Sequence, residues 1–151
     1  ADYLLRRLAL TMEQDFDRIF WFALMDLDER VDPRDRYYGL ITRDATPKPS
    51  FLALRYFLRL TGDRIEPIES PIGNVSAENF CFAWKSANGN RLVFFWGPKS
   101  QFIKLPEGTK AILHDPFSGE QKVIPDTVQS VQVEPRFQIL EFSPLGTNVK
   151  R

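Results

Sequence analysis

The stretch from residue 79 to residue 97, NFCFAWKSANGNRLVFFWG, contains two apolar runs on either side of an Asn-Gly pair. An Asn-Gly pair readily adopts the positive φ angles of a tight turn, so it is a strong signal for two paired antiparallel strands. We therefore predict strands over 79–86 and 91–97. Trp84 and Trp96 lie within these strands, and we expect both to belong to the core.

The same pattern of short apolar runs and turns continues toward the end of the chain. Turn signals rich in proline and glycine lie at 106–108, 116–119 and 135–136. Seven short strands separated by such turns favour an antiparallel β-sandwich, with a small barrel-like sheet as the alternative. The further predicted strands cover 101–105, 110–114, 120–124, 128–133 and 137–142.

Before residue 62 the sequence has a different pattern, which indicates helix, strand and helix. Residues 2–14 place apolar side chains at helical spacing. Residues 18–25, RIFWFALM, form a nearly continuous apolar run, which is typical of a central parallel strand covered on both faces. A second helix is expected over 49–60, and its apolar residues cover nearly the whole circumference, so it should pack on more than one side. The fold class is α+β.

This change of pattern divides the chain into four parts. Residues 1–62 are interpreted as the terminal unit of a larger α/β domain, and 63–77 as a linker because of its Pro and Gly residues. Residues 78–144 form the predicted β-domain, and 145–151 a tail. Since the chain begins at Ala1 inside an amphipathic pattern, we expect that it was processed or cut from a longer protein.

Composition excludes several functional classes. The 20 basic residues balance the 20 acidic residues, so there is no electrostatic reason to expect nucleic acid or an anionic membrane as a partner. No apolar run reaches the length of a membrane helix, and no signal peptide is visible, so we expect a protein of the bacterial cytoplasm or a secreted one. One cysteine and one histidine, Cys81 and His114, leave no disulfide, metal site or Ser-His-Asp triad. We expect no cofactor and a hydrogen-bonded or surface role for His114.

Three segments in a fixed order carry a resemblance to a known enzyme family. They read RIFWFALMD at 18–26, YGLITRD at 38–44 and TPKPSFLAL at 46–54. Together they closely resemble the last βα unit of the (β/α)8-barrel glycoside hydrolases of the retaining, two-glutamate clan. The later segments AILHDPFSG at 111–119 and PRFQILE at 135–141 are similar to parts of the β-domain appended to many such barrels. One departure is His114, where a Tyr or similar residue is common in the family.

The resemblance implies a parent enzyme that hydrolyses O-glycosidic bonds of a carbohydrate by a retaining mechanism. Such enzymes use two carboxylates about 5–5.5 Å apart. In the family these glutamates end the fourth and seventh strands, which would place both upstream of Ala1. We therefore expect no catalytic residue in this chain, and no activity of the chain alone.

Four residues near the end of the predicted strand are candidates for substrate binding. Active sites of barrel enzymes lie at the carboxyl ends of the strands, and Asp26, Asp28 and Glu29 follow the apolar run. Trp21 could stack on a sugar ring, as a Trp on the eighth strand often lies near the substrate in these families. The alternative is that the acidic residues form a solvated loop and that Trp21 is structural.

Two functions are consistent with these observations. The chain is either the C-terminal part of a glycoside hydrolase, or an independent carbohydrate-binding or structural β-sandwich module. In the first case, the segment 18–25 and the helix 49–60 lack neighbours, and we expect either a rearrangement that buries them or self-association through their exposed surfaces. Carbohydrate is the expected partner through the parent enzyme in the first case, and the direct partner of a carbohydrate-binding module in the second.

Overall fold

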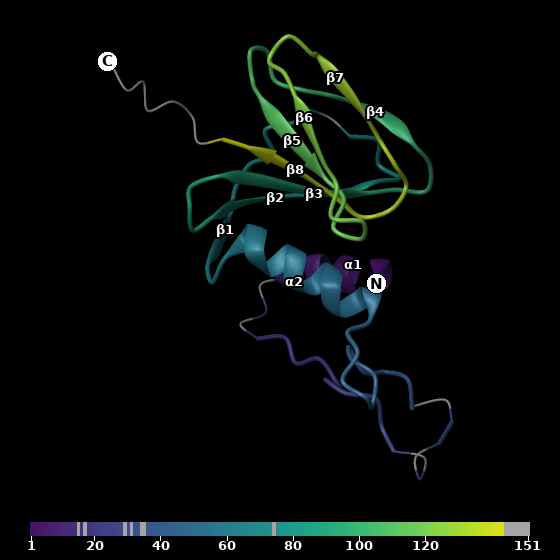
Figure 1. Ribbon diagram of the computed structural model, residues 1–151. Coiled ribbons are helices and arrows are strands. Elements are labelled where there is room, and N and C mark those ends of the chain that lie inside the picture. Colours follow the sequence, from purple (N-terminus) through teal and green to yellow (C-terminus); the bar gives the residue numbers. More distant parts are fainter. Residues whose placement is uncertain are drawn as a thin grey trace.

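The computed structural model describes residues 1–143 except for 15, 17, 29, 31, 34, 35 and 74. Two helices precede a set of short strands, and this arrangement confirms the α+β class (Figure 1). The elements are α1 (Asp2–Glu13), α2 (Pro49–Thr61), β1 (Ile65–Pro67), β2 (Phe80–Ser86), β3 (Arg91–Trp96), β4 (Gln101–Lys104), β5 (Ala111–His114), β6 (Gln121–Ile124), β7 (Ser130–Val133) and β8 (Gln138–Phe142).

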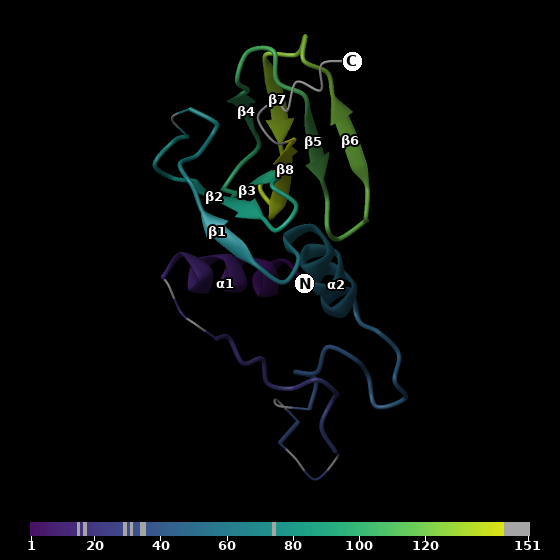
Figure 2. The same ribbon diagram turned by 90° about the vertical axis from the view of Figure 1, so that its left-hand side faces the viewer.

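The strands form two sheets with antiparallel pairing throughout. The larger sheet has six strands in the order β1-β2-β3-β8-β5-β6, and β4 pairs with β7 in a separate two-stranded sheet. The last strand, β8, therefore lies between β3 and β5. Both views place α1 and α2 on one side of the six-stranded sheet and the β4–β7 pair on the other (Figures 1 and 2).

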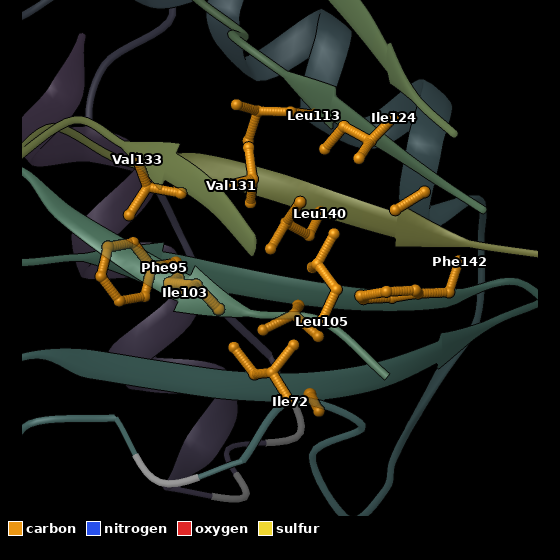
Figure 3. Packing of buried hydrophobic residues seen from close by; sticks show 13 residues of the cluster. Ile72, Phe95, Ile103, Leu105, Leu113, Ile124, Val131, Val133, Leu140 and Phe142 are labelled. Atoms are coloured by element: carbon orange, nitrogen blue, oxygen red, sulfur yellow. The ribbon is translucent and has the colours of Figure 1, made fainter. Parts of the chain in front are cut away.

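Each face of the six-stranded sheet has its own core. Along β3, Phe94 points toward the helices and packs with Leu5 of α1 and Phe57 of α2. The neighbouring residue, Phe95, points to the opposite face and packs with residues of the β4–β7 pair, such as Val133 (Figure 3). Because successive side chains of a strand point to opposite faces, burial on both sides explains why β3 is apolar at almost every position.

All seven predicted strands are present, and their ends differ from the prediction by at most two residues. The predicted hairpin turn is formed between β2 and β3, where Gly89 has a φ of 82° and its N–H donates to the carbonyl of Ser86 at 2.8 Å. An additional strand, β1, lies within the segment predicted to be a linker. It contains Pro67 and occupies the edge of the sheet, where a missing N–H is tolerated.

Both predicted helices are confirmed, and α2 is covered in part, by the sheet and by α1. The helix ends at Gly62, which has a φ of 72° and donates its N–H to the carbonyl of Leu58 at 3.0 Å. Ala53 and Phe57 are buried against the sheet, whereas Leu52 and Leu58 are exposed. The helix therefore packs against the sheet and α1, and Leu52 and Leu58 remain uncovered. Among the described residues, no helix combines the length and the apolar character needed to cross a bilayer.

The prediction of a buried strand over 18–25 is wrong. This segment forms no strand, and Phe20 and Phe22 have exposed fractions of 87% and 70%. Its single ladder contact is a parallel bridge between Met25 and Ile41. A central parallel strand needs strands on both sides, and the described strands all belong to the antiparallel sheets. The connection from α1 to α2 instead projects away from the sheets in both views (Figures 1 and 2).

Candidate functional site

Trp21 lines a groove between the two helices and the segment that follows α1. The groove has a volume of about 460 Å³, and its walls are largely apolar, with Leu8 and Met12 from α1 and Leu54 and Leu58 from α2. The exposed fraction of Trp21 is 37%. The indole is therefore partly covered by the groove and partly accessible, as a stacking platform requires.

Asp26 lies at the end of the apolar run and is largely buried, with 8% of its side chain exposed. Its carboxylate forms an ion pair with Lys48, the residue before the first turn of α2, and accepts a hydrogen bond from the Gly39 N–H at 3.0 Å. The Lys48 ammonium also donates to the carbonyl of Tyr37 at 3.1 Å. Both partners of Asp26 contact its Oδ1, so this side chain connects the end of the apolar run to Gly39 and to the start of α2.

The close approach at Gly39 explains why a glycine stands there. A Cβ atom on Gly39 would lie 2.3 Å from the backbone nitrogen of Asp26 and 2.4 Å from the carbonyl carbon of Met25. Both are backbone atoms, so neither could move aside as a flexible side chain does. Gly39 thus allows the chain to pass directly beside the residues that precede and include Asp26.

Asp28 is half-buried and is bonded to arginines of the same connection. Its Oδ1 accepts the backbone N–H of Arg30 at 2.9 Å and the guanidinium Nε at 3.1 Å, and its Oδ2 lies 3.7 Å from a guanidinium nitrogen of Arg43. The backbone N–H of Arg30, followed by its guanidinium, lowers the pKa of Asp28 below its ordinary value. Such a carboxylate is a poor proton donor. Glu29, the remaining candidate, lies outside the described residues.

The structure does not bring these candidates into one site. Asp26 and Asp28 do not belong to the lining of the groove that contains Trp21. Among the described residues, no group of three His, Cys, Asp or Glu side chains is placed to hold a metal ion. Of the three described candidates, Trp21 lines a groove, whereas Asp26 and Asp28 are bonded within the connection between the helices.

A second polar arrangement connects α2 with the sheet. His114 has an exposed fraction of 1%. Its Nδ1 lies 2.8 Å from the hydroxyl of Tyr56, and its Nε2 lies 2.8 Å from Oε2 of Glu141. We call these three side chains the Tyr56–His114–Glu141 relay. The expectation of a hydrogen-bonded histidine is confirmed.

Sequence reasoning did not find the partners of His114. Tyr56 and Glu141 lie 58 and 27 residues from His114 along the chain. They meet only because α2 packs on the sheet and β5 pairs with β8. The one available signal was a histidine in an otherwise apolar strand, which indicates a buried polar group that needs partners.

Comparison with known proteins gives no family for this chain. No protein-family model matches it, and no curated protein matches it.

Proposed function

We propose that this chain is the C-terminal part of a glycoside hydrolase, and that the parent enzyme hydrolyses O-glycosidic bonds of a carbohydrate by a retaining mechanism. In this proposal the chain supplies the last βα elements and an appended β-domain, and the catalytic glutamate pair belongs to the rest of the parent. The observation that carries the proposal is the exposed apolar run over residues 19–25.

The exposure of this run is unusual for an independent domain. Phe20, Phe22 and Leu24 present most of their surface to solvent. Burial of one such side chain stabilises a protein by roughly 1.5–3 kcal/mol, and contiguous apolar patches are rare on monomers. A run that is apolar on both faces suits a strand between two parallel neighbours, which the remainder of a barrel would provide.

The outer face of α2 supports the same proposal. Phe51, Leu54 and Leu58 line a shallow apolar groove of about 310 Å³, together with the stems of Arg55 and Arg59. This groove lies on α2 itself and includes none of the sheet residues. In a barrel, the last helix has neighbouring helices and an inner strand, and these would cover such a surface.

The β-domain has a structural role in this proposal. Its core continues into α1 and α2 through Leu5, Ala9, Ala53 and Phe57. The backbone N–H of Phe137 also donates to the carboxylate of Asp2 at 2.8 Å. The domain would therefore hold the last helices of the barrel in place, while Trp21 is the candidate for contact with sugar among the described residues.

The test is to determine the coding sequence upstream of Ala1 and to assay the resulting longer protein beside this chain on a panel of aryl glycosides. We expect upstream strands that end in glutamate, turnover by the longer protein and none by this chain. An upstream stop codon or an unrelated upstream domain would overturn the proposal. Turnover by this chain alone would refute the assignment of the catalytic pair to the rest of the parent.

A second candidate function is an independent carbohydrate-binding or structural module. It is favoured by the closed cores on the two faces of the six-stranded sheet, one of them shared with α1 and α2, in which Phe94, Phe95 and Leu140 are fully buried. Light scattering separates the two functions. A module should be a monodisperse monomer, whereas a part of a barrel should self-associate through its exposed run.

A further inference from the structure

The Tyr56–His114–Glu141 relay joins three elements at one buried imidazole. Tyr56 lies on α2, His114 ends β5, and Glu141 lies on β8. Two amide side chains extend the relay, because Gln121 donates to the Tyr56 hydroxyl at 3.1 Å and Asn90 donates to the second carboxylate oxygen of Glu141. Helix and sheet are thus connected by an uninterrupted set of polar contacts.

The hydrogen-bonding groups of Glu141 and Tyr56 require one particular protonation state of His114. A carboxylate only accepts hydrogen bonds, so Nε2 of His114 must donate to Glu141. In a neutral imidazole the other nitrogen, Nδ1, then accepts, and the Tyr56 hydroxyl donates to it. The hydroxyl oxygen remains available to accept from Gln121. Every member of the relay is satisfied when the ring is neutral.

Protonation of the His114 ring disrupts this pairing of donors with acceptors. Both imidazole nitrogens then donate, so the Tyr56 hydroxyl faces a donor in place of its acceptor and must turn its own proton away. Burial opposes the charged ring and lowers the pKa of His114, although the hydrogen bond and the charge of Glu141 act in the opposite direction. The other charges near the relay are Arg59 on α2 and Asp115 after β5, which pairs with Arg136.

We propose that the Tyr56–His114–Glu141 relay is a pH-responsive latch that fastens α2 to the β-domain at neutral pH and releases it when His114 takes up a proton. The latch does not depend on the proposed hydrolase relationship, because it involves only contacts within this chain. It would control how firmly residues before 62 are held on the sheet.

The sign of the pH dependence follows from the lowered pKa. A solvated histidine titrates at about 6.5, whereas the docked His114 takes up its proton only at lower pH. Between these two values the open state binds a proton and the docked state does not. The stability of docking is therefore greatest at neutral pH and is lost as the pH falls below about 6.5, by at most about tenfold in equilibrium constant per pH unit.

The experiment is an NMR titration of the full chain from pH 8 to pH 4.5. Since the chain has one histidine, its imidazole resonances need no assignment. We expect a titration midpoint below 6.5. Hydrogen exchange of the α2 amides, corrected for intrinsic rates, should accelerate below that pH. A midpoint at or above 6.5, or exchange of α2 that does not change with pH, would overturn the proposal.

Substitutions in the relay give opposite and diagnostic shifts. Tyr56→Phe removes the hydroxyl that stabilises the neutral ring, so the midpoint of His114 should rise and the protection of α2 at pH 7.5 should fall. Glu141→Gln removes the carboxylate that favours the charged ring, so the midpoint should fall further. Tyr3→Phe, at an exposed tyrosine of α1, is the matched control and should leave the midpoint unchanged. A Tyr56→Phe variant with the wild-type midpoint would refute the latch.

Discussion

The ion pair between Asp26 and Lys48 joins the end of the exposed apolar run to the start of α2. The Asp26 carboxylate also accepts a hydrogen bond from the N–H of Gly39, and the Lys48 ammonium donates one to the carbonyl of Tyr37. This pair of side chains thus joins the two ends of the connection between the helices, beside backbone hydrogen bonds such as those from the Leu40 N–H to the Leu24 carbonyl and from the Lys48 N–H to the Leu40 carbonyl. This explains how a segment with an exposed apolar surface keeps a defined conformation.

Replacement of Asp26 by Asn should loosen this connection. The substitution removes the ion pair and leaves the Lys48 ammonium without its partner, which we expect to cost about 1–3 kcal/mol of local stability. The measurement is hydrogen exchange of the Leu40 and Lys48 amides, which are bonded to backbone carbonyls of the connection. The control is Asp126→Asn, at an exposed aspartate of the turn after β6, with an expected effect within about 0.5 kcal/mol. Equal effects of the two substitutions would contradict the structural role of Asp26.

Gly39→Ala should destabilise the connection between the helices, although it adds a single methyl group. The added methyl group would lie 2.3 Å from the Asp26 nitrogen, so the backbone must move and the Asp26 hydrogen bond must lengthen. We expect a loss of more than about 1 kcal/mol, because overpacking typically costs 1–3 kcal/mol. The same exchange of the Leu40 amide measures it. Gly73→Ala is the control, since a Cβ there meets nothing within 4 Å. A neutral Gly39→Ala would show that the close approach is not maintained in solution.

The strands were predictable because their signals are local. The Asn88-Gly89 turn and the prolines of later turns specify where each strand ends, and alternation of apolar residues specifies the buried face. The weak sequence signal of β1 also has a physical cause. Three residues that include Pro67 have little strand propensity, and only the pairing of β1 with β2 makes them a strand.

The failure over residues 18–25 has a different cause. An apolar run of this kind indicates that a segment is suited to burial between neighbouring strands. Those neighbours come from other segments of the sheet, so the run alone does not determine whether the strand forms. The described part of the chain offers Ile41 as the one bridge partner, at Met25. The relay was missed for a related reason, because Tyr56 and Glu141 come together with His114 only through tertiary packing.

Phe137→Ala should destabilise the whole fold. The ring of Phe137 is fully buried where α2 meets the sheet, with its centroid 5.7 Å from that of Phe94 and 6.2 Å from that of Phe57. Removal of a buried Phe side chain typically costs about 3–5 kcal/mol, which is a large part of the roughly 5–15 kcal/mol that stabilises a domain. Urea unfolding measures this loss. Phe102→Ala, at an exposed position of β4, should leave the unfolding midpoint nearly unchanged, and a comparable shift there would argue against the assignment of the core.

Substitution of Phe20 and Phe22 by Ser separates the two proposed functions. If the exposed run associates with other copies, each buried Phe contributes about 1.5–3 kcal/mol, so loss of both should weaken self-association by about a hundredfold or more. Sedimentation velocity over a range of concentrations gives this change, with Phe102→Ser as a control at a distant exposed Phe. The urea stability of the isolated chain, measured at concentrations where it is monomeric, should remain the same, because these side chains then lie in solvent. In a longer parent enzyme the same two substitutions should destabilise the fold, since the run would then be a buried strand. Two results together would contradict the hydrolase proposal: a monomeric chain with Phe20 and Phe22 present, and a longer protein that tolerates both substitutions. The run would then not be a barrel strand, and the independent module would be the better description.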